Sequence, residues 1–214
     1  MTQAIFFDLD QTLLDRARTF QSYLAHLYAD VVAPLNVAAE SFYAEIHRWD
    51  DNGYRDKLET FALTVDQLAM SATAEQLFAH FRKNYGQDAV LFDGVTETLG
   101  YLKRKYPLAL ISNGRTKGQQ KKLDITGIGH FFDQILISEA ERIKKPEPEL
   151  YLRACQKMKV APGDVIFVGD HPTNDIEAPK KLGMRAIWVR NDVYDPPIDH
   201  DGIVQSVAEL PDLL

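Results

Sequence analysis

The sequence predicts an α/β fold: a Rossmann-like core with a parallel sheet that carries an inserted α-helical domain. Three observations predict it. Short apolar runs rich in β-forming residues recur along the chain, segments of helical period separate them from the second run onward, and the long stretch between the first two runs has helical period alone. Strands that alternate with helices indicate a parallel sheet with right-handed crossovers.

The expected strands are apolar runs. In chain order they are AIFFDLD, LALISNG, QILIS, VIFVGD and AIWV, at residues 4–10, 108–114, 134–138, 165–170 and 186–189. Segments such as VTETLGYLKRKY and EPELYLRACQKMKV have helical period and supply the helices of the core. Residues 192–214 are expected to add a last strand and a helix.

The stretch between the first two runs departs from this alternation. It holds amphipathic segments such as TFQSYLAHLYADVVA and AEQLFAHFRKNYG and no convincing strand, although a crossover needs only about a dozen residues. We therefore expect residues 1–15 and 91–214 to form the α/β core and residues 16–90 to form an inserted helical domain. Asp93 and Gly94 mark the turn at which the chain enters the next core helix.

Composition excludes several classes of protein. With 45% hydrophobic and 26% charged residues, the chain of 214 is neither disordered nor fibrous, and its net charge of -7 opposes nucleic acids and anionic membranes as partners. Its single cysteine, Cys155, cannot form an intramolecular disulfide, and the sequence shows neither a signal-peptide pattern nor an apolar stretch of membrane-spanning length. We expect a cytoplasmic protein, and the choice between monomer and homodimer stays open.

Polar residues close these runs, at the strand ends where ligands bind in open α/β sheets. They are Asp8, Asp10, Ser112, Asn113 and Asp170, with Lys145 and Asp175 just outside strands. Each alone is typical of a turn, a helix cap or a solvated side chain. Together, three strand-end carboxylates at one rim would raise one another's pKa unless a cation lay between them. Mg²⁺, which takes a few carboxylates plus a substrate phosphate, satisfies that need.

Four motifs in this order, FDLDQT, SNG, KP and GDHPTND, resemble the haloacid dehalogenase superfamily of aspartate-nucleophile phosphatases. The resemblance covers nearly all of the expected core, and the helical insertion after the first motif is similar to the α-helical cap domain of subfamily IA. It implies a Mg²⁺-dependent phosphatase that hydrolyses a small phosphorylated metabolite through an aspartyl-phosphate intermediate.

The resemblance also implies a role for each site residue. Asp8 would attack phosphorus, and Asp10 would act as general acid and base. The groups implied to bind the phosphoryl oxygens are Ser112, Lys145 and the backbone N–H groups of Asn113 and Gly114. The implied metal ligands are Asp8, the backbone carbonyl of Asp10, and Asp170. Asp175 would orient Lys145 or the waters of the metal.

One segment departs from the family's pattern. After the fourth motif the family runs through small residues into a helix, whereas this chain places Pro179 there, in IEAPKKLGM. Because proline is harmless only near a helix start, we expect this helix to begin late or to kink. The departure bears on the position of Asp175 and leaves that of Asp170 unaffected.

The inserted domain is expected to read the leaving group of the substrate, because a cap closes over the site in such enzymes. Its most polar and aromatic segment is HRWDDNGYRDK, residues 47–57. The expected substrate contacts there are Trp49, Tyr54 and Arg55. A surface turn between two helices, with its aromatic side chains packed on the cap, is the structural alternative.

Other activities stay open as alternatives. A phosphosugar mutase or phosphotransferase of the same superfamily would return the phosphoryl group to a sugar, and only an assay separates it from a phosphatase. A dehalogenase would have little use for a carboxylic acid at Asp10. A phospho-accepting signalling receiver is shorter, lacks a helical insertion and does not end in a GDxxxND strand. A phosphatase is therefore the predicted function.

Overall fold

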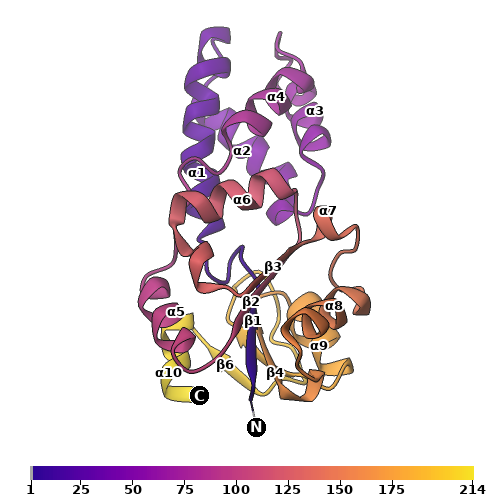
Figure 1. The fold of residues 1–214 in the computed structure, drawn as a ribbon. Coiled ribbons are helices and arrows are strands. Elements are labelled where there is room, and N and C mark those ends of the chain that lie inside the picture. Colours follow the sequence, from indigo (N-terminus) through magenta and orange to yellow (C-terminus); the bar gives the residue numbers. More distant parts are fainter. Residues whose placement is uncertain (1) are drawn as a thin grey trace. The chain divides into compact units, whose positions relative to one another are not determined.

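The computed structural model describes residues 2–214, and the strands of these residues form one parallel sheet. They are β1 (Ala4–Phe7), β2 (Leu108–Ser112), β3 (Gln134–Ile137), β4 (Val165–Gly169), β5 (Arg185–Val189) and β6 (Gly202–Val204). Their order in the sheet is β3-β2-β1-β4-β5-β6 (Figure 1). Every apolar run named from the sequence contributes a strand, and so does the expected C-terminal segment. The predicted α/β fold is confirmed.

The order in which strands are added to the sheet changes direction beside β1. The chain passes from β1 to β2 and β3 on one side and then continues with β4 on the other, so that Phe7 is in register with both Leu110 and Val168. In open α/β sheets, ligands bind outside the carboxyl ends of the strands at such a switch point. The ends of β1 and β4, where the first and fourth motifs lie, therefore define the expected site.

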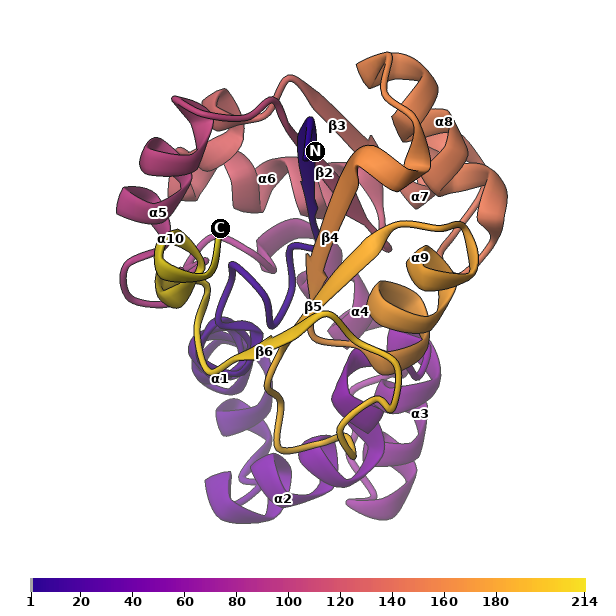
Figure 2. The same ribbon diagram turned by 90° about the horizontal axis from the view of Figure 1, so that it is seen from below.

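Helices cover both faces of the sheet, with α5, α6 and α10 on one face and α8 and α9 on the other (Figure 2). The core helices are α5 (Val95–Lys103), α6 (Thr116–Thr126), α7 (Ser138–Glu141), α8 (Pro148–Met158), α9 (Ala178–Lys181) and α10 (Leu210–Leu213). Alternate residues of β1 serve the two layers, because successive side chains of a strand point to opposite faces. Ile5 and Phe7 pack with Leu99 of α5, whereas Phe6 packs with Tyr151 of α8. All four residues of β1 are fully buried.

The chain divides into two compact units, one formed by Met1–Ala17 with Ala89–Leu214 and the other by Arg18–Asp88. The second unit is helical, as expected for the insertion between the first two strands. Its helices are α1 (Arg16–Leu27), α2 (Ala39–Asp50), α3 (Lys57–Gln67) and α4 (Ala74–Asn84). Aromatic rings fill its interior, for example Tyr23 and Phe81, whose centroids lie 5.3 Å apart in an edge-to-face arrangement.

Local signals fix where two helices of this second unit, α3 and α4, begin. The Asp56 side chain accepts hydrogen bonds from backbone N–H groups of the first turn of α3. Thr73 and Gln76 form a reciprocal capping box at the start of α4. At the return to the core, Gly94 adopts a left-handed conformation (φ 78°) immediately before α5, so the predicted turn is confirmed.

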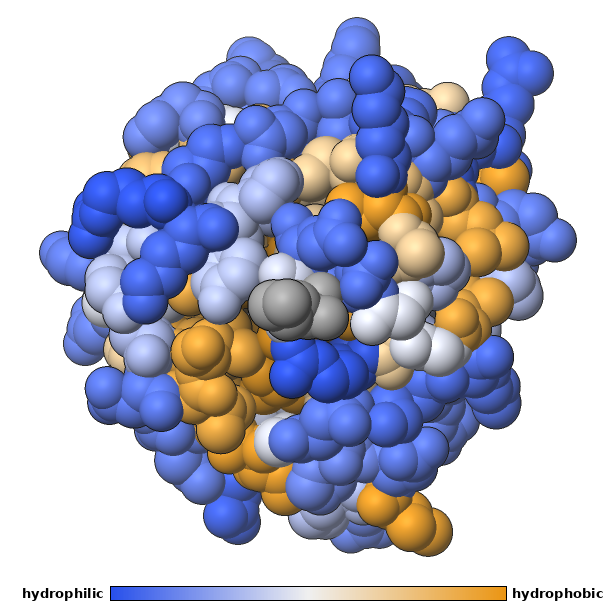
Figure 3. Space-filling view, turned by 60° about the horizontal axis from the view of Figure 1, so that its bottom comes forward, coloured by the Kyte–Doolittle hydropathy of each residue, from blue (hydrophilic) through white to orange (hydrophobic). Residues whose placement is uncertain are grey.

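Figure 3 shows the face of the core around the amino ends of the strands. Hydrophilic side chains predominate on it, and apolar side chains gather in smaller groups between them. The strand-end carboxylates follow the carboxyl ends and so belong to the opposite edge of the sheet. Within residues 2–214, no helix has the length and apolar character that crossing a membrane requires.

Candidate active site

Asp8 and Asp10 lie in the loop that follows β1. The Asp8 N–H donates to the Val168 carbonyl (3.0 Å), which extends the pairing of β1 with β4 by one residue. The loop then closes on itself, because the Leu14 N–H donates to the carbonyl of the fully buried Leu9 (2.8 Å). Apolar residues therefore anchor the loop in the core and leave the two aspartates at the carboxyl edge of the sheet.

Lys145 joins two of the carboxylates and is itself only 3% exposed. Its ammonium Nζ donates to Asp8 Oδ1 (2.6 Å) and to Asp175 Oδ1 (2.7 Å). The Asn113 side chain holds the Lys145 backbone, donating to its carbonyl (2.9 Å) and accepting from its N–H (2.8 Å). Burial alone would lower the pKa of Lys145, but the carboxylates of Asp175 and Asp8 raise it above its ordinary value. The lysine is therefore a fixed cation.

Asp8, Asp170 and Asp175 form a buried cluster in which one carboxylate oxygen from each lies within 4.8 Å of the others. Burial, together with the charge of Asp175, raises the pKa of Asp8 to about 7 against the opposing effect of Lys145. Burial and the neighbouring carboxylates also raise the pKa of Asp170 well above its ordinary value. The negative charges of these carboxylates are not fully compensated by the protein. Three carboxylate oxygens are donors that a hard divalent cation prefers, so the cluster fits a metal ion.

The two oxygens of Asp175 both have protein partners. Oδ1 accepts from Lys145, and Oδ2 accepts from the His171 N–H (3.0 Å). Asp8 and Asp170 are therefore better placed than Asp175 to ligate a metal. Gly169 makes this arrangement possible, since a Cβ at this residue would lie 2.4–2.5 Å from atoms of the Asp175 side chain.

Pro179 lies in the first turn of α9. A π-helical turn over Pro172–Glu177 precedes it and carries Asp175, whose N–H donates to the His171 carbonyl (2.8 Å). The backbone is already helical at Glu177, and the Ala178 N–H donates to the Thr173 carbonyl in the wider π-helical pattern, so the proline follows directly on this π-helical turn. The regular helix thus begins late, at Ala178, which is one of the two outcomes expected from the sequence.

Asp10 is bound by two residues of α6 that the sequence reasoning missed. Lys122 Nζ lies 2.7 and 3.0 Å from the two Asp10 carboxylate oxygens, and Gln119 Nε2 donates to Asp10 Oδ2 (2.8 Å) and to Ser112 Oγ (2.6 Å). Burial alone would raise the pKa of Asp10, but Lys122 and Gln119 lower it below its ordinary value. The signal was a lysine three residues after a glutamine, which places both side chains on one face of the helix after SNG.

The backbone near Ser112 differs in one respect from the expected phosphate cradle. The Gly114 N–H, one of two backbone donors implied for phosphate, already donates to Ser138 Oγ (2.9 Å). Helix α6 starts at Thr116, so neither Asn113 nor Gly114 occupies its first turn. The Gly114 donor is therefore withdrawn from the expected set, and the Asn113 N–H remains.

The candidate substrate contacts of the helical unit gather near the end of α2. Trp49 Nε1 donates to Glu45 Oε2 (3.0 Å), and the Arg55 guanidinium lies 5.5 Å from the Trp49 ring centroid. Tyr54 is 57% exposed. A tight turn over residues 51–53 separates Trp49 from Tyr54 and Arg55. All three residues of the turn have positive φ angles, and Gly53 is the only glycine among them. Trp49 and Arg55 therefore lie near each other, and contact of the three residues with a substrate stays a prediction.

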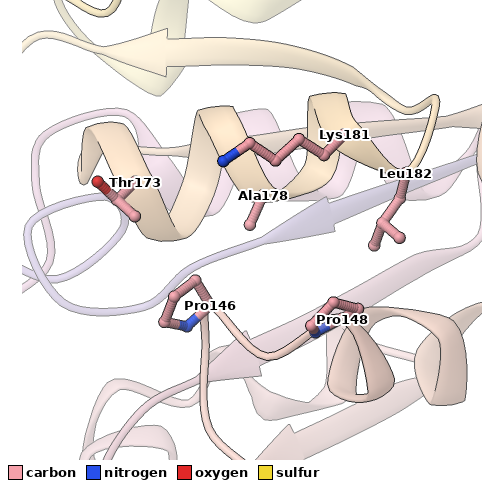
Figure 4. A pocket seen from close by; sticks show the side chains of 6 residues that line it. All are labelled: Pro146, Pro148, Thr173, Ala178, Lys181 and Leu182. Carbon is pink, nitrogen blue, oxygen red and sulfur yellow. The ribbon is translucent and has the colours of Figure 1, made fainter.

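A cavity of about 260 Å³ lies beside the fourth motif (Figure 4). It is lined by Pro146, Pro148, Thr173, Ala178, Lys181 and Leu182. Pro146 belongs to the KP motif and Thr173 to the GDHPTND motif, but the lining includes none of the strand-end carboxylates. One ammonium and one hydroxyl among apolar groups do not match the donor set of the carboxylate cluster, so the cavity is separate from the candidate active site.

Comparison with known proteins agrees with the arrangement of motifs. The family model of haloacid dehalogenase-like hydrolases matches residues 5–189. The chain is 28% identical to N-acylneuraminate-9-phosphatase from Homo sapiens, over 99% of this chain and 93% of that protein. It is 32% identical to glyceraldehyde 3-phosphate phosphatase from Pyrococcus furiosus, over 99% of this chain and 91% of that protein.

A solved structure has the same fold. The magnesium-bound protein YfnB from Bacillus subtilis superposes with a TM-score of 0.83 at 20% identity, covering 100% of this chain and 98% of that one. The family match spans β1 to β5 and includes the helical insertion, so it extends over both units. On this evidence the chain belongs to the haloacid dehalogenase-like hydrolase family.

Proposed function

We propose that this protein is a Mg²⁺-dependent phosphatase that hydrolyses a small phosphomonoester through an aspartyl-phosphate on Asp8. The observation that carries the proposal is the buried ammonium of Lys145, which bridges Asp8 and Asp175 beside Asp170. A nucleophilic carboxylate, a fixed cation and a cluster that fits a metal thus meet at the switch point of the sheet.

Two carboxylates divide the proton and bond chemistry between them. An oxygen of Asp8 forms a bond to phosphorus while the bond to the leaving oxygen breaks, and Asp10 protonates that oxygen. Asp10 then takes a proton from water, whose oxygen attacks phosphorus and releases Asp8. The contacts of Asp10 with Lys122 and Gln119 favour its ionised form, which serves the second step and opposes the protonated form that the first step requires.

The remaining groups hold the phosphoryl oxygens and their charge. Lys145 offsets negative charge on the oxygens, and Ser112 Oγ with the Asn113 N–H supplies hydrogen bonds. Asp8 and Asp170 with the Asp10 backbone carbonyl would hold Mg²⁺, which supplies charge neutralisation at the transferring phosphoryl group. Asp175 keeps Lys145 in place through its hydrogen bond.

The proposed substrate is a small phosphorylated metabolite. The names of the related phosphatases, which act on N-acylneuraminate 9-phosphate and glyceraldehyde 3-phosphate, support that class and leave its member open. The helical unit is proposed to select the leaving group, with Trp49, Tyr54 and Arg55 as its contacts. A phosphotransferase of the same family would share every core residue and differ in the acceptor.

Phosphate release tests the proposal. The panel comprises sugar phosphates, nucleoside monophosphates, phosphoglycolate and a chromogenic aryl phosphate, each with Mg²⁺ and with chelator. We expect turnover that requires Mg²⁺ and that Asp8→Asn lowers about 10⁴-fold or more, because it removes the nucleophile. Asp212→Asn, which changes an exposed carboxylate of α10, is the matched control and retains activity. Folded wild type that releases no phosphate from any member contradicts the proposal.

A further inference from the structure

Asn191, in the loop after β5, contacts a carboxylate of the cluster. Its Nδ2 donates to Asp170 Oδ2 at 2.7 Å. Its Oδ1 accepts the Val193 N–H at 2.9 Å, which fixes the orientation of the amide, because exchanging oxygen and nitrogen would set two donors against each other. The amide therefore presents a donor to Asp170 in a defined direction.

The turn that carries Asn191 is held by contacts of Tyr194. The Tyr194 N–H donates to the Asn191 carbonyl (3.3 Å). The Tyr194 ring packs beside the His171 ring at a centroid distance of 4.8 Å and joins a small cluster that contains the fully buried Trp188. Asn191 is thus preorganised by its own loop and does not depend on Asp170 for its position.

Asp170 is in turn fixed at three atoms. The Trp188 indole Nε1 donates to its backbone carbonyl (2.6 Å), Asn191 donates to Oδ2, and Thr12 Oγ1 lies 3.4 Å from Oδ1. The bond to Oδ2 is much the shorter of the two side-chain contacts. Oδ1 is therefore the oxygen with more capacity left for a ligand.

We infer that Asn191 is a positioning residue that occupies Asp170 Oδ2 and leaves Oδ1 directed at the metal. The inference rests on the proposed function for the presence of Mg²⁺ in the carboxylate cluster. Hydrogen bonds to the ligands of a metal orient them, and losing one typically costs 10- to 100-fold in metal affinity. Asn191 lies outside the four motifs, and both polar atoms of its side chain have protein partners.

Metal affinity, measured by isothermal titration of the whole metal-free protein with Mg²⁺, tests this role without any substrate. Asn191→Ser keeps an oxygen that can accept the Val193 N–H, but its side chain is too short to reach Asp170. Asn191→Leu removes both polar groups. Gln205→Leu makes the same change of amide to leucine at an exposed residue after β6 and is the matched control.

We expect both Asn191 variants to bind Mg²⁺ roughly 10- to 100-fold more weakly than wild type, while Gln205→Leu binds equally well. Activity of Asn191→Ser should return to within about threefold of wild type at saturating Mg²⁺, because the residue acts through metal occupancy. Unfolding in chelator verifies that each variant is folded, and Asn191→Ser decides the matter if Asn191→Leu does not fold.

Wild type that binds Mg²⁺, with a folded Asn191→Ser variant whose affinity is within twofold of it, overturns the positioning role and leaves the proposed function intact. Wild type that binds no Mg²⁺ overturns the metal site and with it both proposals. The two failures are therefore distinguishable in one titration series.

Discussion

The charged site of the core and the polar, aromatic segment of the helical unit are built in opposite ways. In the core, Lys145 is bonded to Asp8, 137 positions away, and Lys122 to Asp10, 112 positions away. In the helical unit, Trp49 bonds Glu45 four positions away, and Arg55 bonds the residue four positions after it.

The core site is also more deeply buried than the segment of the helical unit. The Lys145 side chain is 3% exposed, whereas that of Arg55 is 31% exposed and Tyr54 is 57% exposed. A group fixed by distant partners in a dry environment tolerates little change, because each lost contact leaves a buried charge uncompensated. A group fixed by its own helix can be replaced at small cost. The contrast predicts that chemistry depends on the core and that selectivity varies with the helical unit.

Among the variants that test this contrast, the largest effect is expected from Lys145→Gln. It removes the cation between two buried carboxylates, so activity should fall about 10³-fold, and the metal-free protein should lose about 3 kcal/mol of stability. Lys144→Gln, which changes the exposed neighbour, is the control and should leave both quantities unchanged. Steady-state kinetics and urea unfolding in chelator measure the two effects. Equal activity and stability of the two variants would contradict the importance of the buried Lys145 contacts in the core.

Gly169→Ala should follow with a loss of about 100-fold in activity. The new Cβ would overlap the Asp175 side chain, which must move and take its contact with Lys145 along, and a misplacement of about 1 Å has this order of effect. Gly118→Ala is the control, because nothing lies within 4 Å of a Cβ there. It should retain activity and change stability by no more than about 1 kcal/mol. A fully active Gly169→Ala would show that Asp175 is dispensable.

Lys122→Met tests the contact that holds Asp10. We expect kcat to fall about 30-fold with KM within about threefold, because proton transfer by a positioned side chain typically contributes 10²- to 10⁴-fold and only its positioning is lost. Lys121→Met changes the adjacent lysine and should act like wild type. A rise in KM without a fall in kcat would instead assign Lys122 to substrate binding.

Mg²⁺ should stabilise the protein more at pH 8 than at pH 5.5. Metal binding needs ionised carboxylates, and with the pKa of Asp8 at about 7 and that of Asp170 also raised, protons compete at the lower pH. At 100 times Kd the gain is about 2.7 kcal/mol. Thermal unfolding with and without Mg²⁺ measures it, and Asp170→Asn should abolish it.

In chelator the dependence on pH has the opposite sign. A carboxyl whose pKa is raised in the folded chain binds more protons there than in the unfolded chain, so it stabilises the fold below about pH 4 and loses that contribution as pH rises through 7. The stability difference between wild type and Asp8→Asn in chelator should therefore fall between pH 5 and 8, and a difference that rises would contradict the raised pKa of Asp8.

The smallest effect on chemistry is expected from Tyr54→Ala in the helical unit. Turnover of a small aryl phosphate should change by less than about threefold, because the Tyr54 side chain is 57% exposed. The ranking of larger substrates should shift by up to about tenfold, since lost apolar contact is worth about 1–3 kcal/mol at most. Ile203→Ala, at an exposed residue of β6, should shift nothing. An unchanged ranking would indicate that Tyr54 is a surface residue only.

Local sequence patterns predicted much of the fold and many of the residues at the candidate site. The apolar runs predicted β1 to β5, since a parallel strand buried on both faces must be continuously apolar, and the C-terminal segment supplied β6. Gly94 marked the entry to α5 because its left-handed conformation favours glycine. The strand-end carboxylates and Lys145 were recognisable because their motifs follow one another in the order typical of the family. Asp8, Asp170 and Asp175 do lie together in the structure.

What the sequence could not supply was the pairing of side chains across the fold. Lys122, Gln119 and Asn191 are ordinary polar residues in the sequence, and their contacts with Asp10 and Asp170 depend on how α6 and the loop after β5 pack against β1 and β4. The Gly114 N–H likewise has a partner from another segment. Sequence alone determined the fold class and singled out the strand-end carboxylates, because both follow from local pattern. The environment of each charge depends on distant segments, so it was decided by tertiary packing.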